Sequence, residues 1–168
     1  MRYDVESRSA RSRGYKEEAM GSSAMSGGSS VAALRVLAVL LGVFILSMGI
    51  DKRAWLTDSG ILLGLLQEWS ASAGAINRWY LETIAIPGAP VFARLVLFGE
   101  LTAGLALIFC FRVRLTATLT FLMVLNFHYA SDVIFHYSYF INAYGFPVMG
   151  GLLALALGGR RLPLSLSG

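Results

Sequence analysis

Four long apolar runs dominate the hydropathy pattern of this 168-residue chain. Each run holds about 17 to 21 residues, enough at about 1.5 Å per residue for a helix to cross the roughly 30 Å hydrocarbon core of a bilayer. We therefore expect an all-α fold, an integral membrane four-helix bundle, in which Pro147 bends the last helix. The expected spans are residues 31–50, 91–111, 115–134 and 141–157.

The segment between the first two runs, residues 57–89, has a different pattern. Two short sets of apolar residues recur there at helical spacing, namely Leu62, Leu65, Leu66 and Trp69, and then Ile76, Trp79 and Tyr80. Both sets are too short and too polar to cross a bilayer, and tryptophan favours the level of the lipid head groups. We expect two short interfacial helices that lie at one membrane surface.

The two ends of the chain are polar. Residues 1–30 mix basic and acidic side chains and end in a Gly/Ser-rich stretch, a composition typical of disordered segments. No basic segment followed by an apolar run and a small-residue cleavage site is found, so we expect no cleaved signal peptide. The predicted organisation is a polar tail over 1–30, a membrane domain over 31–161 and a short tail over 162–168.

Composition agrees with a membrane location, since 56% of the residues are hydrophobic and only 14% are charged. A soluble domain carries about 25% charged residues, so too few polar groups remain here to cover a globule. The net charge of +4 therefore indicates topology rather than a nucleic-acid partner.

The basic residues are distributed unevenly about the predicted spans. Of the 14 Lys and Arg residues, the side opposite the termini would hold only Lys52, Arg53, Arg78 and Arg94. The positive-inside rule then places both termini in the cytoplasm, for a multipass protein of a bacterial inner membrane.

Glu100 is the first candidate for chemistry, because it lies near the middle of the second predicted span, where an unpaired carboxylate is costly. Folding the second and third spans about a turn at 112–113 brings position 100 level with 125 or 126. We therefore expect a contact between Glu100 and Asn126. Such a pair could handle protons or bind a quinone, or it could be a hydrogen bond of about 1 kcal/mol that holds two helices in register.

His128 and Asp132 are the second candidate. They lie four residues apart near the outer end of the third span, so a helix would place them on one face, where the carboxylate could tune the imidazole for proton transfer. His136 and Arg94 are candidate cofactor or anion contacts. The alternatives are polar helix ends at the head groups, and an interfacial belt for the many aromatic residues of 127–144.

Other kinds of site have little support in the sequence. Cys110 is the only cysteine, which excludes dithiol redox chemistry within the chain. No phosphate-binding loop, nucleophile triad or metal-ligand cluster is found, so no metal is expected.

Three short motifs occur together in the predicted membrane domain. They are Gly-x-x-Lys over 49–52, Gly-Glu-Leu-Thr-Ala-Gly-Leu-Ala-Leu over 99–107, and Leu-Asn-Phe over 125–127 after the basic turn at Arg114. With these motifs the chain over 31–161 resembles the DoxX family. The long segment between the first two spans is similar to the DoxD-like branch, the small subunit of thiosulfate:quinone oxidoreductase. The charged N-terminal tail and the Gly-Gly-Arg-Arg ending over 158–161 depart from the family pattern.

The resemblance implies a four-helix membrane bundle found beside redox partners, and it assigns no residue a role. We expect an accessory subunit of a larger respiratory or photosynthetic electron-transfer complex, in contact with other membrane subunits and lipids. Quinone is the candidate cofactor, and pigment or lipid contacts are also considered. The alternative is a membrane subunit of a thiosulfate- or sulfur-compound:quinone oxidoreductase, in which Glu100, Asn126, His128 and Asp132 handle protons and Arg94 lies near the anion.

Overall fold

The computed structural model describes residues 31–142 and 144–159, and all regular structure within them is helical. The all-α prediction is confirmed. The predicted tails over 1–30 and 162–168 lie outside the described residues, as do the last two residues of the predicted membrane domain.

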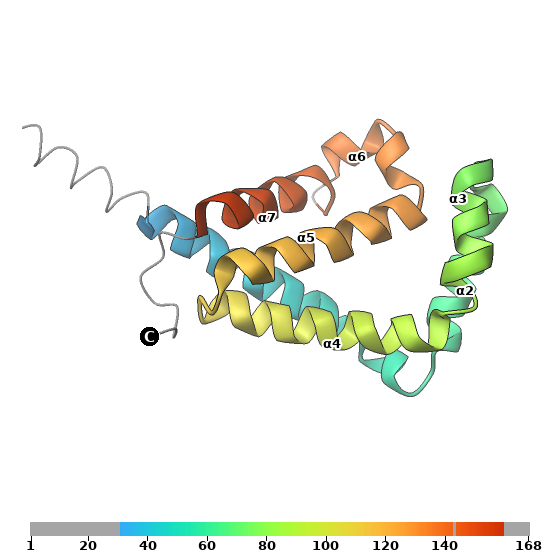
Figure 1. The fold of residues 1–168 in the computed structure, drawn as a ribbon, viewed down its shortest axis with the longest axis horizontal. Coiled ribbons are helices and arrows are strands. Elements are labelled where there is room, and N and C mark those ends of the chain that lie inside the picture. Colours follow the sequence, from blue (N-terminus) through green and yellow to red (C-terminus); the bar gives the residue numbers. More distant parts are fainter. Residues whose placement is uncertain (1–30, 143, 160–168) are drawn as a thin grey trace, which may run out of the picture.

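Four helices lie side by side and alternate in direction along the chain (Figure 1). They are the first helix, residues 31–51, which continues into the 3-10 turn η1 (Lys52–Leu56); α4 (Ala89–Ile108); α5 (Val113–Ala130); and α7 (Phe146–Gly158). Each falls within a predicted span or overlaps it closely. The turn between α4 and α5 covers residues 109–112, and its Cys110 and Arg112 adopt positive φ values of 53° and 40°.

The last helix differs from the prediction. Residues 138–141 form a separate short helix, α6 (Ser138–Ile141), and α7 begins only at Phe146. Pro147 therefore lies in the first turn of α7 and does not bend it, because a first-turn residue has no helical acceptor for its N–H and the proline ring is tolerated there. With 13 residues, α7 is about 20 Å long, shorter than a bilayer core.

The two short helices predicted after the first span are present. They are α2 (Gly60–Ser72) and α3 (Ala75–Tyr80), the latter continuing into the π-helical turn η2 (Leu81–Ala85), and they stand across one end of the longer helices (Figure 1). Asn77 ties α3 to α5, since its amide nitrogen lies 3.0 Å from the carbonyl oxygen of Tyr129 and 3.4 Å from that of Ala130. These are carbonyls of the last turn of α5, which have no partner within the helix.

Glycines let the first helix and α4 touch backbone to backbone. A Cβ atom on Gly104 would lie 2.6 Å from the backbone nitrogen of Leu46, and one on Gly42 would lie 2.8 Å from the carbonyl oxygen of Gly104. Both distances are below any real carbon contact, so only glycine fits at this crossing. Small residues at such crossings are the usual means of close helix packing in membranes.

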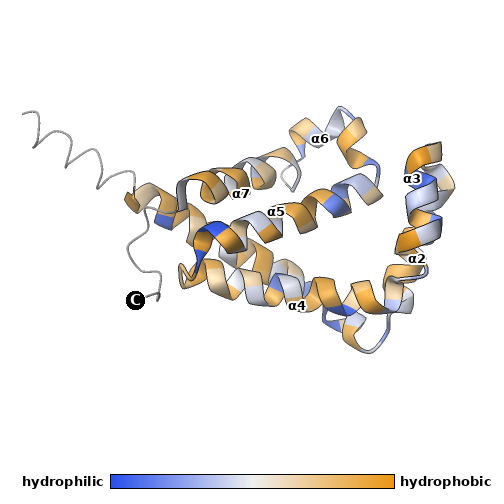
Figure 2. Cartoon of the chain, viewed as in Figure 1, coloured by the Kyte–Doolittle hydropathy of each residue, from blue (hydrophilic) through white to orange (hydrophobic). Residues whose placement is uncertain are grey.

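In the part of the chain that the structure describes, two helices are long and apolar enough to cross a membrane: Val31–Leu56, which includes η1, and Ala89–Ile108. In their most apolar stretches only 22% and 33% of the residues are buried. Figure 2 shows apolar residues along the length of the first helix, α4 and α7. Large side chains that face outward include Leu40, Leu95, Phe98, Leu119, Leu122 and Leu157. An apolar surface of this extent requires a lipid or protein covering.

The substitution Gly104→Ala should destabilise the protein by about 1–3 kcal/mol, because the added methyl group overlaps the Leu46 backbone and forces the two helices apart. Thermal unfolding in a mild detergent, followed by circular dichroism, measures the effect. Gly150→Ala on α7 is the matched control, since nothing lies within 4 Å of its added Cβ and alanine favours a helix. Equal melting temperatures for the two variants would contradict this account of the crossing.

Candidate functional site

A buried ion pair joins the end of the first helix to the middle of α4. The ammonium nitrogen of Lys52 lies 2.8 Å from each carboxylate oxygen of Glu100, and their side chains are 13% and 9% exposed. The same ammonium donates to the carbonyl oxygen of Met48 at 3.3 Å. Lys52 therefore supplies a counter-charge to Glu100, the only acidic residue of α4, within the apolar interior.

The local sequence explains why these residues meet. A Cβ on Gly49 would lie 3.1 Å from the Cβ of Glu100, so the missing side chain makes room for α4 at this level. Lys52 follows Met48 and Gly49 by about one helical turn, which places its side chain on the same face of the helix. The helix then tightens into η1, where Trp55 is buried with its ring centroid 5.8 Å from the Lys52 nitrogen.

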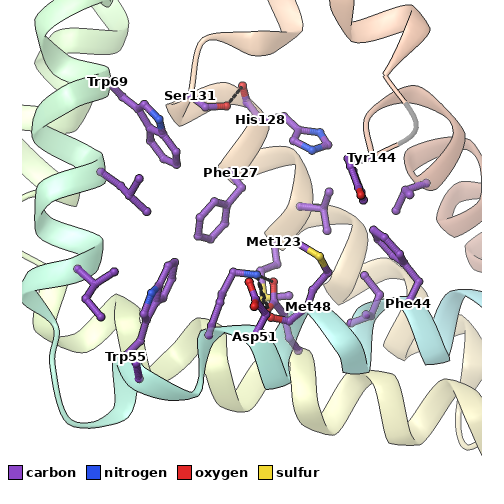
Figure 3. Close-up of a pocket in the computed structure, with 18 residues that line it drawn as sticks. Phe44, Met48, Asp51, Trp55, Trp69, Met123, Phe127, His128, Ser131 and Tyr144 are labelled. Carbon is purple, nitrogen blue, oxygen red and sulfur yellow. Dashed lines mark hydrogen bonds and ion pairs between the residues drawn. The ribbon is translucent and has the colours of Figure 1, made fainter.

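The ion pair forms part of the wall of a half-open cavity of about 520 Å³ (Figure 3). We call it the Lys52–Glu100 cavity. Its walls combine aromatic, sulfur-containing and aliphatic side chains, most of them from the first helix, η1, α2 and α5. They include Phe44, Met48, Trp55, Trp69, Met123, Phe127 and Tyr144. Phe127 projects between the two tryptophans, stacked on Trp55 at 6.3 Å and edge-on to Trp69 at 6.2 Å between ring centroids.

A second polar group of the cavity comes from the C-terminal end of α5. The His128 ring lies in the cavity wall, and its Nδ1 atom is 3.3 Å from the hydroxyl oxygen of Tyr139 on α6. Burial raises the pKa of Tyr139, and its hydroxyl can donate a hydrogen bond to Nδ1 when the imidazole carries its hydrogen on Nε2. Ser131 also lines the cavity and donates to the carbonyl oxygen of His128 at 3.3 Å.

A second cavity, of about 500 Å³, lies on the other side of Phe127 between α2, α4 and α5. Its lining is apolar apart from Tyr80 and Asn126, and the Tyr80 hydroxyl donates to the side-chain oxygen of Asn126 at 2.7 Å. Trp69, Met123 and Phe127 line both cavities.

The predicted contact between Glu100 and Asn126 is wrong. Glu100 pairs with Lys52, and Asn126 accepts a hydrogen bond from Tyr80. The turn after α4 covers 109–112 rather than 112–113, so α5 is displaced along α4, and Gly99 meets Met123. Matching residues across a helical hairpin also does not show which face of α4 carries residue 100. In the structure that face points to the first helix.

The predicted pairing of His128 with Asp132 is also wrong, because α5 ends at Ala130 and the two residues do not share a helical face. Asp132 has a φ of 62°, which turns the chain away from the helix. Its carboxylate lies 3.3 Å from the Asn77 amide nitrogen and 3.6 Å from the His136 ring.

The two candidate cofactor contacts lie away from both cavities described above. Arg94 is exposed on α4 and donates to the carbonyl oxygen of Pro90 in its own helix. His136 follows the short turn η3 (Val133–Phe135), and its side chain is 64% exposed. Of the predicted site residues, only Glu100 and His128 line the same cavity.

The residue that sequence reasoning missed is Lys52. It marked the end of the first span, and no local pattern pairs residues 48 positions apart. Two signals were available: the lone carboxylate inside the second span, and a lysine one turn after Gly49. A carboxylate in an apolar span needs a cationic partner, and Lys52 was a candidate for it.

No group of three His, Cys, Asp or Glu side chains that could hold a metal ion occurs within residues 31–142 and 144–159. The polar groups of the cavity are instead two carboxylates, one ammonium, one imidazole and hydroxyls, which suit proton exchange and hydrogen bonding to a small organic molecule. No family model, curated relative or solved structure matches the chain.

Lys52→Met should destabilise the protein by about 3–5 kcal/mol, because it leaves the Glu100 carboxylate buried without a counter-charge. The double variant Lys52→Met/Glu100→Met should recover most of that loss, since apolar side chains of similar length replace both charges. Unfolding of both variants in the same detergent measures the difference. A double variant less stable than Lys52→Met would show that the ion pair is not what stabilises this contact.

Proposed function

We propose that this chain is a DoxX-like multipass protein of the bacterial inner membrane, with both termini in the cytoplasm. Among the described residues, two helices are long enough to cross a bilayer, and exposed apolar side chains on the first helix, α4, α5 and α7 also support a membrane location. The charge distribution agrees with it, since Arg112 and Arg114 lie at the end with the turn between α4 and α5. The opposite end carries both signs of charge, including Arg53, Asp58 and Glu82.

Within that membrane we propose that the chain is an accessory subunit of a larger respiratory or photosynthetic electron-transfer complex, and that it forms part of the path of a quinone. The observation that carries the proposal is the Lys52–Glu100 cavity. It is walled by Trp55, Trp69 and Phe127 and contains one buried ion pair and one imidazole. Flat aromatic walls with a few polar groups are the usual features of a site for a ring compound with polar substituents.

The size and position of the cavity support the same ligand class. A volume of about 520 Å³ falls in the range of small-molecule sites, and the cavity is half-open, so a head group can enter while its tail stays in the surrounding lipid. The apolar outer faces of α4 and α5 leave room for a hydrophobic neighbour, such as a core subunit of the complex.

Binding of a decyl-benzoquinone should quench the tryptophan fluorescence of the purified protein, because Trp55 and Trp69 line the cavity whereas Trp79 is 60% exposed on α3. Titration in detergent measures the affinity. Trp79→Phe is the matched control, and it should preserve the saturable quenching. Trp55→Phe/Trp69→Phe should abolish it. Quenching that is linear in quinone and the same in every variant would rule out a site.

Purification in a mild detergent tests the subunit assignment. The chain should migrate with other membrane proteins, one of which carries a redox cofactor. Isolation of the chain alone, from membranes in which redox complexes stay intact, would contradict the accessory role.

A second proposal is a membrane subunit of a thiosulfate- or sulfur-compound:quinone oxidoreductase. It is favoured by one observation, the presence of Glu100 and His128 in one cavity, where they could exchange protons with a quinone. The anion half of the reaction would need another subunit, because Arg94 lies away from this cavity and Lys52 is already paired.

The two proposals differ in what a substitution does to turnover. In an oxidoreductase subunit, Glu100→Gln and His128→Ala each abolish quinone reduction by membranes supplied with thiosulfate. In an accessory subunit, both variants assemble and the complex retains most of its turnover. Full activity in both variants would reject the second proposal.

A further inference from the structure

The Lys52 ammonium is directed at acceptors of the protein itself. A lysine ammonium has three donors and no acceptor. Here the nitrogen lies within hydrogen-bond distance of both oxygens of Glu100, at 2.8 Å each, and of the Met48 carbonyl oxygen, at 3.3 Å. The cation is therefore directed mainly at Glu100 and at the Met48 carbonyl oxygen rather than at a ligand in the cavity.

Glu100 still has hydrogen-bond acceptor sites that Lys52 does not occupy. A carboxylate has about four lone-pair sites on its two oxygens, and Lys52 occupies one on each oxygen. The Glu100 side chain keeps 9% of its surface exposed and lines the cavity. What the ion pair presents to a ligand is therefore hydrogen-bond acceptors.

The other polar groups supply both acceptors and donors, and a quinol hydroxyl can pair with both kinds whereas a quinone carbonyl can pair only with donors. The donors include the His128 ring, when its Nδ1 accepts from Tyr139, and the Tyr144 hydroxyl. Asp51 also lines the cavity, and its carboxylate can only accept. The hydroxyl hydrogen of Ser131 is directed to the His128 carbonyl oxygen. The indole N–H groups of Trp55 and Trp69 are donors on the aromatic wall, so they can serve a second oxygen on the far side of a ring.

We infer that the cavity binds the reduced form of its ring ligand, a quinol or a related phenol, in preference to the quinone, through a ligand hydroxyl that donates to Glu100. This inference rests on the proposed function and adds the redox state of the ligand. A quinol hydroxyl supplies the donor that the carboxylate lacks, and a hydrogen bond to an ionised acceptor is among the stronger kinds. A quinone carbonyl in the same place would bring an oxygen with only lone pairs against another acceptor.

The preference has a thermodynamic consequence. If the quinol binds tenfold more tightly than the quinone, the two-electron reduction potential of the bound couple rises by about 30 mV relative to the free couple. The site would then hold quinol for oxidation by a partner, and the product quinone, which has lost two electrons and two protons, would leave more readily.

Two matched probes test the inference without redox chemistry. Para-decylphenol and para-decylanisole have the same ring and tail, and differ in whether the oxygen carries a hydrogen or a methyl group. Each is used to displace decyl-benzoquinone from the purified full-length protein, with restoration of tryptophan fluorescence as the readout, at equal mole fraction in the detergent. We expect the phenol to displace the quinone at a concentration about tenfold or more below that of the anisole.

The double variant Lys52→Met/Glu100→Met is the control for partition into detergent, since it removes the acceptor and keeps an apolar side chain at both positions. In that variant the phenol and the anisole should act at similar concentrations. A potentiometric titration of the bound decyl-benzoquinone couple gives an independent measurement on the unmodified protein, with an upward shift expected.

The outcomes separate the inference from the proposed function. Equal displacement by the two probes, or a bound potential at or below that of the free couple, overturns the preference for the quinol while the quinone site stands. The same selectivity in the double variant overturns the role of Glu100. The absence of saturable quenching by decyl-benzoquinone overturns the proposed function and this inference with it.

Discussion

The ion pair between Lys52 and Glu100 is the interaction on which the arrangement of this molecule depends. A carboxylate halfway along an apolar helix is expensive to bury, and the expense is offset only by a counter-charge at close range. Lys52 supplies it with two contacts of 2.8 Å. The end of the first helix is thereby held at the middle of α4, and the η1 turn that follows carries Trp55 into the cavity wall.

Close helix packing makes that pair possible. Gly49 leaves space beside Glu100, and Gly42 and Gly104 let the two backbones meet farther along. A Cβ on Gly42 or Gly104 would lie within 2.8 Å of the facing helix, so a larger residue at either position would force the two helices apart. The glycines and the charged pair are thus parts of one interface, in which small residues set the distance and the charges set the register.

The Lys52–Glu100 cavity follows from this interface and from the two short helices. Because α2 and α3 stand across the end of the longer helices, Trp69 faces Phe127 and closes one side of the space. His128 closes another, held by the Tyr139 hydroxyl of α6. The result is a polar centre within aromatic walls, on a molecule whose outer faces are apolar. A site of that kind suits a lipid-soluble ring compound, and it accounts for a buried charged pair in a chain without a metal-ligand cluster in its described part.

Sequence alone determined the helices of this protein, because hydropathy and the spacing of apolar residues are local properties. The apolar runs, the two short helices before Pro87 and the importance of Glu100 could all be read from it. Which residues of different helices contact one another could not be read from it. The hairpin estimate failed because α4 ends a few residues early and because sequence does not say which face of a helix meets which neighbour.

Helix ends were the other weak point. The pairing of His128 with Asp132 assumed a helix that continues to residue 134, whereas α5 stops at Ala130 and Asp132 turns the chain with a positive φ. Only the tertiary structure decided that Glu100 meets Lys52 and that His128 faces the same cavity. Both contacts depend on the rotation and offset of whole helices, which local sequence patterns do not specify. For Lys52 and Glu100 these are set by close packing between two helices at Gly42, Gly49 and Gly104.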